Sequence, residues 1–186
     1  MLEYNCFNTQ SKDTIDKSSS QLIGITLHST KRKFDYCATL KDIGKDFNVS
    51  TGYYSRTGIS QATLLLKPKV YSDSIVVRRI DFELFSSYTY DKIYSMGETF
   101  NHISALALIG NTLQFKVKYS LSNEIFLGKK FNTGGFHVFL GGSCGKWLSA
   151  SILYRRINSI LYSSLPYGGK SNILQGAMEI LPFPKL

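Results

Sequence analysis

The residues that most suggest catalysis lie in one short segment, Gly141–Gly145, which fits the G-x-S-x-G pattern of a serine nucleophile. A hydrolase of that type places its histidine after the serine, but every histidine of this chain precedes Ser143. Cys144 could instead act as a thiol nucleophile with His137 as its base, although cysteines are most often simply buried. We therefore expect a protein that is not an enzyme, and a small hydrolase or thiol enzyme is the least favoured alternative.

Nucleotide and metal sites have similarly weak support. Gly169-Lys170-Ser171 matches the end of a phosphate-binding loop, but Ser164 stands where the first glycine of that motif belongs. The three histidines have no metal-ligand spacing with one another or with acidic residues. The sequence therefore predicts neither a metal nor a cofactor.

The residue types do favour recognition of a negatively charged ligand. One glycine-bracketed loop carries Tyr53, Tyr54 and Arg56, which offer flat rings and a bidentate donor to base edges or phosphates. In a second expected loop, Tyr167–Ser171, two glycines allow the backbone to approach a phosphate closely while a lysine and a serine donate to it. Ordinary turns and solvated lysines are the alternatives. The candidate DNA-binding residues are Tyr53, Tyr54, Arg56, Arg78, Lys129, Lys130, Arg155, Gly169, Lys170 and Ser171.

The charge of the chain agrees with a polyanionic partner. Twenty-two Lys and Arg residues against 13 Asp and Glu residues give a formal net charge of +9. No acidic residue lies between Glu124 and Glu179, whereas lysines and arginines recur throughout that interval. Such a surface attracts polyanions, of which nucleic acid is the commonest.

Other features of the sequence favour a cytoplasmic protein without membrane contact. The three cysteines show no C-x-x-C spacing, which disfavours a disulfide scaffold. The first residues lack the basic and apolar regions of a signal peptide. The longest apolar run, Ala105–Ile109, is far shorter than the roughly 20 residues of a membrane-spanning helix.

Hydrophobic spacing predicts the elements that must position these residues. A main helix is expected over Leu148–Ser164, a short helix over Thr39–Asp46 and a helical turn over Asn172–Met178. Strands are expected over Thr63–Lys67, Ser74–Ile80, Thr89–Ser95, Thr112–Ser120 and Phe136–Leu140. These elements predict an α+β domain over residues 21–186, with a twisted, mostly antiparallel or mixed sheet and a few helices, after a flexible arm over residues 1–20.

Two segments resemble the target recognition domain of type I restriction-modification specificity subunits. The first is Thr39–Phe47 with the glycine loop that begins at Thr51. The second is Leu148–Ser164, followed by Gly168–Ser171 and a proline-flanked end at Met178–Pro184. The resemblance covers the order of elements over about residues 39–186. The long helix that follows this domain in the family has no counterpart here.

The resemblance implies an α+β domain that reads double-stranded DNA and carries no catalysis. In that family a separate modification subunit methylates adenine and a restriction subunit cuts, so these two subunits are the expected partners. The leading hypothesis is therefore sequence-specific binding of double-stranded DNA. A protein-interaction module and an RNA-binding module with the same basic face are the alternatives.

Overall fold

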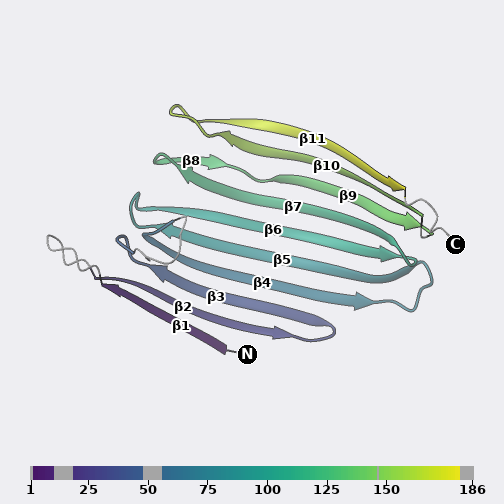
Figure 1. Cartoon of the computed structure of the whole chain (residues 1–186), viewed down its shortest axis with the longest axis horizontal. Helices are drawn as coiled ribbons and strands as arrows, with labels where there is room; N and C mark the ends of the chain where they lie inside the picture. Colours follow the sequence, from purple (N-terminus) through teal and green to yellow (C-terminus); the bar gives the residue numbers. More distant parts are fainter. Residues whose placement is uncertain (1, 11–18, 48–55, 146, 181–186) are drawn as a thin grey trace.

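The chain forms a single antiparallel β-sheet in a computed structural model that describes residues 2–10, 19–47, 56–145 and 147–180. The strands are β1 Leu2–Gln10, β2 Ser19–Thr30, β3 Phe34–Ile43, β4 Ile59–Tyr71, β5 Val77–Asp91, β6 Met96–Ile109, β7 Leu113–Phe126, β8 Lys129–Asn132, β9 Gly135–Cys144, β10 Leu148–Leu161 and β11 Tyr167–Ile180. Each pairs with its neighbour in the order β1-β2-β3-β4-β5-β6-β7-β9-β10-β11, and the short β8 pairs with β7 beside this path (Figure 1). Except for β8 and β9, strands that follow one another in the sequence are paired in the sheet.

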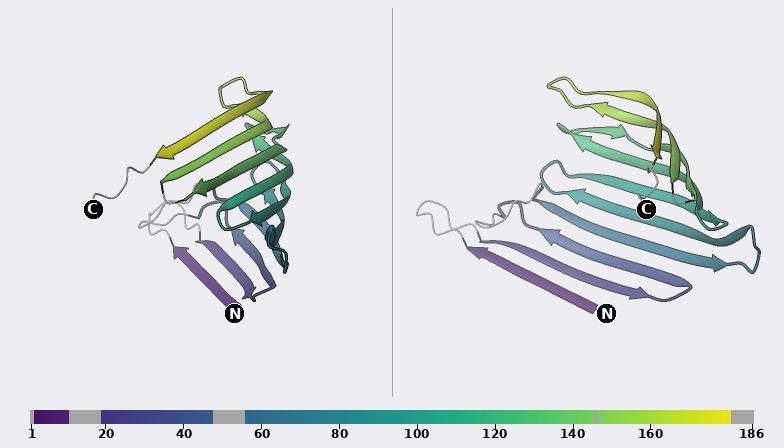
Figure 2. Two further views of the ribbon diagram at one scale, coloured as in Figure 1. Left: turned by 90° about the vertical axis from the view of Figure 1, so that its right-hand side faces the viewer. Right: turned by 45° about the vertical axis from the view of Figure 1, so that its right-hand side comes forward.

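The sheet is strongly curved, and its two edge strands β1 and β11 turn toward the same side (Figure 2). Short turns connect β5 to β6, β6 to β7 and β7 to β8. One is Gly110-Asn111, predicted by its composition, where Gly110 has a φ of 54°. Glycine adopts that left-handed conformation without the steric cost that other residues pay.

The expected α+β class is wrong, because the described part of the chain contains strands and no helix. Residues 148–161 of the expected main helix form β10. Leu148 and Ile152 fit a helical period, but together with Ala150 and Tyr154 they also fit the period of two of a strand. The β-branched and aromatic residues of this segment favour the strand.

The two shorter helices are wrong for the same reason. Most of Thr39–Asp46 belongs to β3, where Leu40 and Ile43 lie on opposite faces instead of sharing one side of a helix. The segment Asn172–Met178 lies inside β11. The strands expected at Thr63–Lys67 and Phe136–Leu140 are confirmed, within β4 and β9. Residues 2–10 pair with β2 as β1, and the flexible arm stays a prediction.

The buried core of the described residues is small. Leu22, Ile43, Phe47 and Ile59 form a cluster at the end of the sheet where β3 finishes and β4 begins. Elsewhere the described residues provide no second layer against the sheet. Most large apolar side chains on the strands consequently remain open on one side.

Candidate functional site

The register of the ladders divides the strand residues into two faces, because directly paired residues point to the same side of a sheet and alternate residues to opposite sides. We call one side the apolar face. On β2 to β7 and β9 to β11 its central residues are Ile23, Ile25, Leu27, Phe34, Tyr36, Ala38, Leu40, Ala62, Leu64, Leu66, Pro68, Val70, Ile80, Phe82, Leu84, Ser86, Tyr88, Tyr90, Ile103, Ala105, Ala107, Ile109, Leu113, Phe115, Val117, Tyr119, Leu121, Phe136, Val138, Leu140, Leu148, Ala150, Ile152, Tyr154, Leu174, Gly176, Met178 and Ile180.

The apolar face carries no charged residue within these stretches. Charges on the same side stand only beyond them, as Asp42, Lys130, Arg156 and Lys170 at one border and Arg78 in the β-bulge at the other. The apolar side chains are open, with Leu121 61% exposed and Ile103 52% exposed. An exposed apolar surface of this extent marks a contact with another apolar medium or partner.

The border of the apolar face runs obliquely across the strands. In the cross-strand row of Leu40 and Tyr88, the residues become polar at Thr99 and Asn123, on β6 and β7. The row of Tyr36 and Leu84, four positions along each strand, stays apolar as far as Phe136 on β9 and becomes polar only at Arg156, on β10. The strands are therefore tilted relative to the long direction of the apolar face.

The opposite side, which we call the polar face, satisfies many of its charges internally. Glu83 binds Lys67 at 2.9 Å and His102 at 2.7 Å. Asp81 pairs with Arg79 at 2.8 Å, and small hydroxyl side chains such as Ser104 are buried between the strands. The side chains of this face are more shielded than those of the apolar face.

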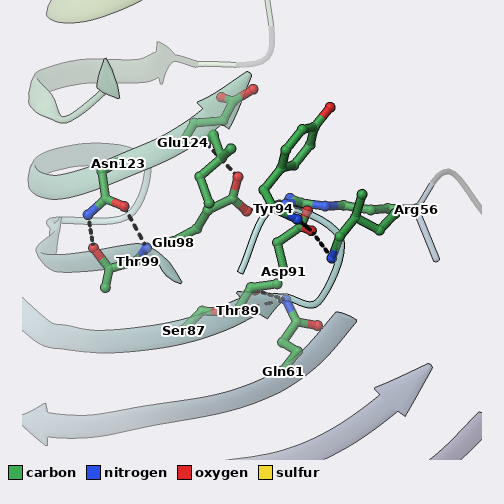
Figure 3. A network of polar contacts seen from close by, with 12 residues as sticks. Arg56, Gln61, Ser87, Thr89, Asp91, Tyr94, Glu98, Thr99, Asn123 and Glu124 are labelled. Carbon is green, nitrogen blue, oxygen red and sulfur yellow. Dashed lines mark hydrogen bonds and ion pairs between the residues drawn. The ribbon is translucent and has the colours of Figure 1, made fainter. Parts of the chain in front are cut away.

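The most connected polar group lies at the end of the polar face, around Arg56 (Figure 3). Arg56 Nη2 donates to Asp91 Oδ2 at 2.6 Å, and Nη1 donates to Glu98. The N–H groups of Ile93 and Tyr94 donate to the second oxygen of Asp91 at 2.8 and 2.9 Å. Burial disfavours the charged forms, but these hydrogen bonds outweigh it, so the pKa of Asp91 is lowered and that of Arg56 is raised.

Arg56 therefore differs from the free DNA donor expected from the sequence. Both terminal nitrogens of its guanidinium are engaged by carboxylates, which leaves little capacity for a bidentate contact with a base. Tyr53 and Tyr54, which share its expected loop, lie outside the described residues. Arg78 lies at the opposite end of the sheet, where it donates to Asn111 at 3.2 Å.

The remaining expected DNA contacts are distributed over both faces. Lys129 and Lys130 are exposed on β8 rather than in a loop. Arg155 lies on the polar face opposite His137. The turns β5–β6, β7–β8 and β10–β11 share one end of the sheet, so Arg56, Lys129 and Lys130 do lie at a common end (Figure 1).

The expected phosphate loop Tyr167–Ser171 is the start of β11. Because successive strand residues point to opposite sides, Lys170 is on the side of the apolar face, while Gly169 and Ser171 are on the other. A shared phosphate cradle over these three residues is therefore not formed.

The segment Gly141–Gly145 is likewise not a strand-to-helix turn. Its first four residues end β9 and its last begins the turn to β10. Cys144 lies on the apolar side and His137 on the polar side of the same strand, so this thiol and its expected base point to opposite faces of the sheet. Ser143 lies six positions from His137, roughly 20 Å along an extended strand.

The described residues contain no group of three or more His, Cys, Asp or Glu side chains placed to hold a metal ion. Nor is there, in the same ranges, a helix with the length and apolarity to cross a membrane. No family model, curated protein or solved structure matches this chain.

The sequence reasoning missed the apolar face as a functional feature. The signal was present as the alternation Leu113, Phe115, Val117 and Tyr119, which correctly predicted a strand, although Leu113, Phe115 and Tyr119 are exposed rather than buried. The same period recurs on most other strands, but there it is blurred by apolar residues on the polar face, such as Leu106 and Leu108 on β6.

Proposed function

We propose that this chain forms a lipid-facing sheet of a membrane protein, with the apolar face against the hydrocarbon of a bilayer and the polar face toward water. The single observation that carries the proposal is the open apolar face, which is free of charge across nine neighbouring strands from β2 to β11. A protein surface that contacted only water would interrupt such a face with charged residues.

The length of the apolar stretches supports a bilayer as the covering medium. On β4 the stretch runs from Ala62 to Val70 and on β7 from Leu113 to Leu121, about nine residues each. Strands that cross a hydrocarbon layer of about 30 Å at a tilt need roughly 9–11 residues. The oblique border of the apolar face agrees with strands that are tilted relative to the bilayer normal.

Aromatic residues at the borders support the same orientation. Tyr88 and Tyr90 stand at one border on β5, and the 47% exposed Trp147 follows β9 at the other. Tyrosine and tryptophan are enriched where a membrane meets water, because their rings have an apolar body and a polar group.

The edge strands set a further requirement. Backbone N–H and C=O groups in hydrocarbon must be hydrogen-bonded, since no water is there to replace a missing partner. The proposal therefore requires a strand partner along the outer edges of β1 and β11.

The single tryptophan allows a direct test. Unfolded full chain is diluted into phosphatidylcholine vesicles that carry bromine either near the headgroups or deep in the acyl chains. We expect Trp147 to be quenched more by the shallow bromines, because it stands at a border of the apolar face.

Two variants move the reporter to adjacent positions on opposite faces. With Trp147→Phe as background, Ile152→Trp places it on the apolar face and Leu153→Trp on the polar face. We expect deep bromines to quench the first strongly and the second weakly. Equal quenching of the two, or a stable dimer without vesicles that shields Ile152→Trp, would show that lipid does not cover this face.

Sequence-specific DNA binding, with its methyltransferase and restriction partners, stays a prediction. Free cations at one end, Lys129 and Lys130, favour it, whereas the engagement of Arg56 by two carboxylates does not. Selection from a randomised DNA duplex pool tests it, because a specific reader enriches a motif and a lipid-facing sheet enriches none.

A further inference from the structure

A polar hollow of about 590 Å³ lies where the apolar face ends on β6, β7 and β10. It forms because the strand after β7 is interrupted. β8 ends at Asn132 and β9 begins at Gly135, and the ladder between β9 and β10 stops at the pair Gly135 and Ile157. Beyond this point only the bond from Asn158 N–H to Gly134 O, at 3.0 Å, continues toward β10.

The backbone at this interruption is tightly packed. A Cβ on Gly135 would stand 2.3 Å from the carbonyl oxygen of Arg156, so no larger residue fits there without moving β10. The hollow is therefore held by close backbone contacts at its floor.

The charge of the hollow is wholly positive. Arg156 and Lys170 line it, both exposed, and none of its lining residues carries a carboxylate. They are two of the three cations at this border of the apolar face, the third being Lys130, which does not line the hollow. On the side toward the apolar face, the hollow is lined by Tyr119, Leu121 and Phe136.

Several polar groups of the hollow remain available to a ligand. The amide of Asn123 is already bonded to Thr99, and the oxygen of Asn101 accepts from Ser86. Among the described residues, by contrast, no hydrogen bond or ion pair occupies the side chains of Arg156, Lys170, Asn132 and Asn158. An anion placed there would receive donors from three elements, β8, β10 and β11.

We infer that this hollow binds the phosphate headgroup of an anionic phospholipid, with Arg156 and Lys170 on the phosphate and the acyl chains along Tyr119, Leu121 and Phe136. This inference rests on the proposed function. An anionic lipid is favoured over a zwitterionic one, because two uncompensated cations oppose the binding of a choline group beside them. Arginine and lysine at the border of an apolar band are suited to lipid phosphates.

The test compares two labelled lipids on the full chain. The protein is refolded in neutral detergent micelles, and the retention of dansyl-labelled phosphatidylglycerol is measured against that of dansyl-labelled phosphatidylcholine. We expect phosphatidylglycerol to bind at least about tenfold more tightly, since both lipids carry the phosphate but only phosphatidylcholine adds a cation that Arg156 and Lys170 repel.

A matched pair of double variants locates the site. Arg156→Gln with Lys170→Gln removes two charges from the hollow, and Lys129→Gln with Lys130→Gln removes two exposed charges at the same end of the sheet that do not line it. We expect the first to abolish the preference for phosphatidylglycerol and the second to leave it within about twofold. The unchanged emission spectrum of Trp147 checks that both variants fold.

Three outcomes would overturn the inference. They are equal retention of the two lipids, equal loss in both double variants, and displacement of the labelled lipid by millimolar inorganic phosphate, which would mark a site for a free anion. Failure of the proposed function is distinguishable, because Trp147 would then escape quenching by brominated vesicles whichever lipid is retained.

Discussion

The two faces of the sheet satisfy their side chains in opposite ways. On the polar face, carboxylates find hydrogen-bond and ion-pair partners within the same sheet, as Glu83 does with Lys67 and His102. On the apolar face, Leu121 and Ile103 lie open over more than half of their surface. The difference teaches that carboxylates of the polar face find their partners within this chain, whereas the apolar face depends on something outside it.

The free energy at stake is large on the apolar face. Full burial of one leucine or isoleucine side chain is worth about 1.5–3 kcal/mol, and the apolar face has many that are only partly covered. An exposed ion pair contributes about 0–1 kcal/mol. Covering the apolar face therefore outweighs any rearrangement of surface charges on the polar face.

The largest expected effect comes from a charge in the middle of the apolar face. Ile152 and Leu153 are neighbours on β10 and point to opposite sides. We expect Ile152→Lys to destabilise the vesicle-inserted protein by about 2–4 kcal/mol, and Leu153→Lys by much less, because only the first places an ammonium in hydrocarbon. Urea unfolding in vesicles, followed by Trp147 emission, measures the difference. Equal destabilisation of the two variants would contradict the assignment of the faces.

A smaller effect is expected when the polar face loses a central partner. Arg56→Ala leaves Asp91, whose side chain is only 3% exposed, without its cation. We expect the free energy of unfolding to fall by roughly 1–3 kcal/mol, since the buried carboxylate then loses its guanidinium donor. Arg78→Ala is the matched control, because that arginine bonds only to Asn111 among the described residues. If Arg78→Ala lost as much stability as Arg56→Ala, the ion pairs of Arg56 would contribute no more than the single contact of an exposed arginine.

The smallest effect is a dependence of stability on pH. The pKa of Asp91 is lowered in the folded chain, so its contribution is complete above the ordinary carboxyl pKa of 3.8 and is lost as the pH falls through the lowered value. We therefore expect the urea midpoint to fall between neutral pH and strongly acidic pH, and to fall less in Arg56→Ala. An equal pH dependence in the variant would indicate that other carboxylates account for it.

The sequence predicted individual strands better than their arrangement. Strict alternation identified β7, and the Gly110-Asn111 turn before it was correct. The error at β10 arose because Leu148 and Ile152, four positions apart, fit a helical period as well as the strand period of two. A single segment does not resolve that ambiguity, whereas pairing with β9 and β11 does.

The candidate site was harder to predict than the strands. A search for long apolar runs stops at Ala105–Ile109, because in a strand polar residues separate the apolar ones. Arg155 was singled out as a phosphate contact, yet its neighbour Arg156 is the one that lines the hollow with Lys170. Which of two adjacent arginines faces the hollow depends on the register of the whole sheet.

By itself, the sequence determined the positive net charge, the turn at Gly110 and the period of two along β7, because charge and backbone preference are local properties. Only the tertiary structure decided that nine separate strands place their alternate residues on one common face and that Arg156 and Lys170 meet at its border. Cross-strand hydrogen bonds fix that register, and they join residues that the sequence keeps far apart.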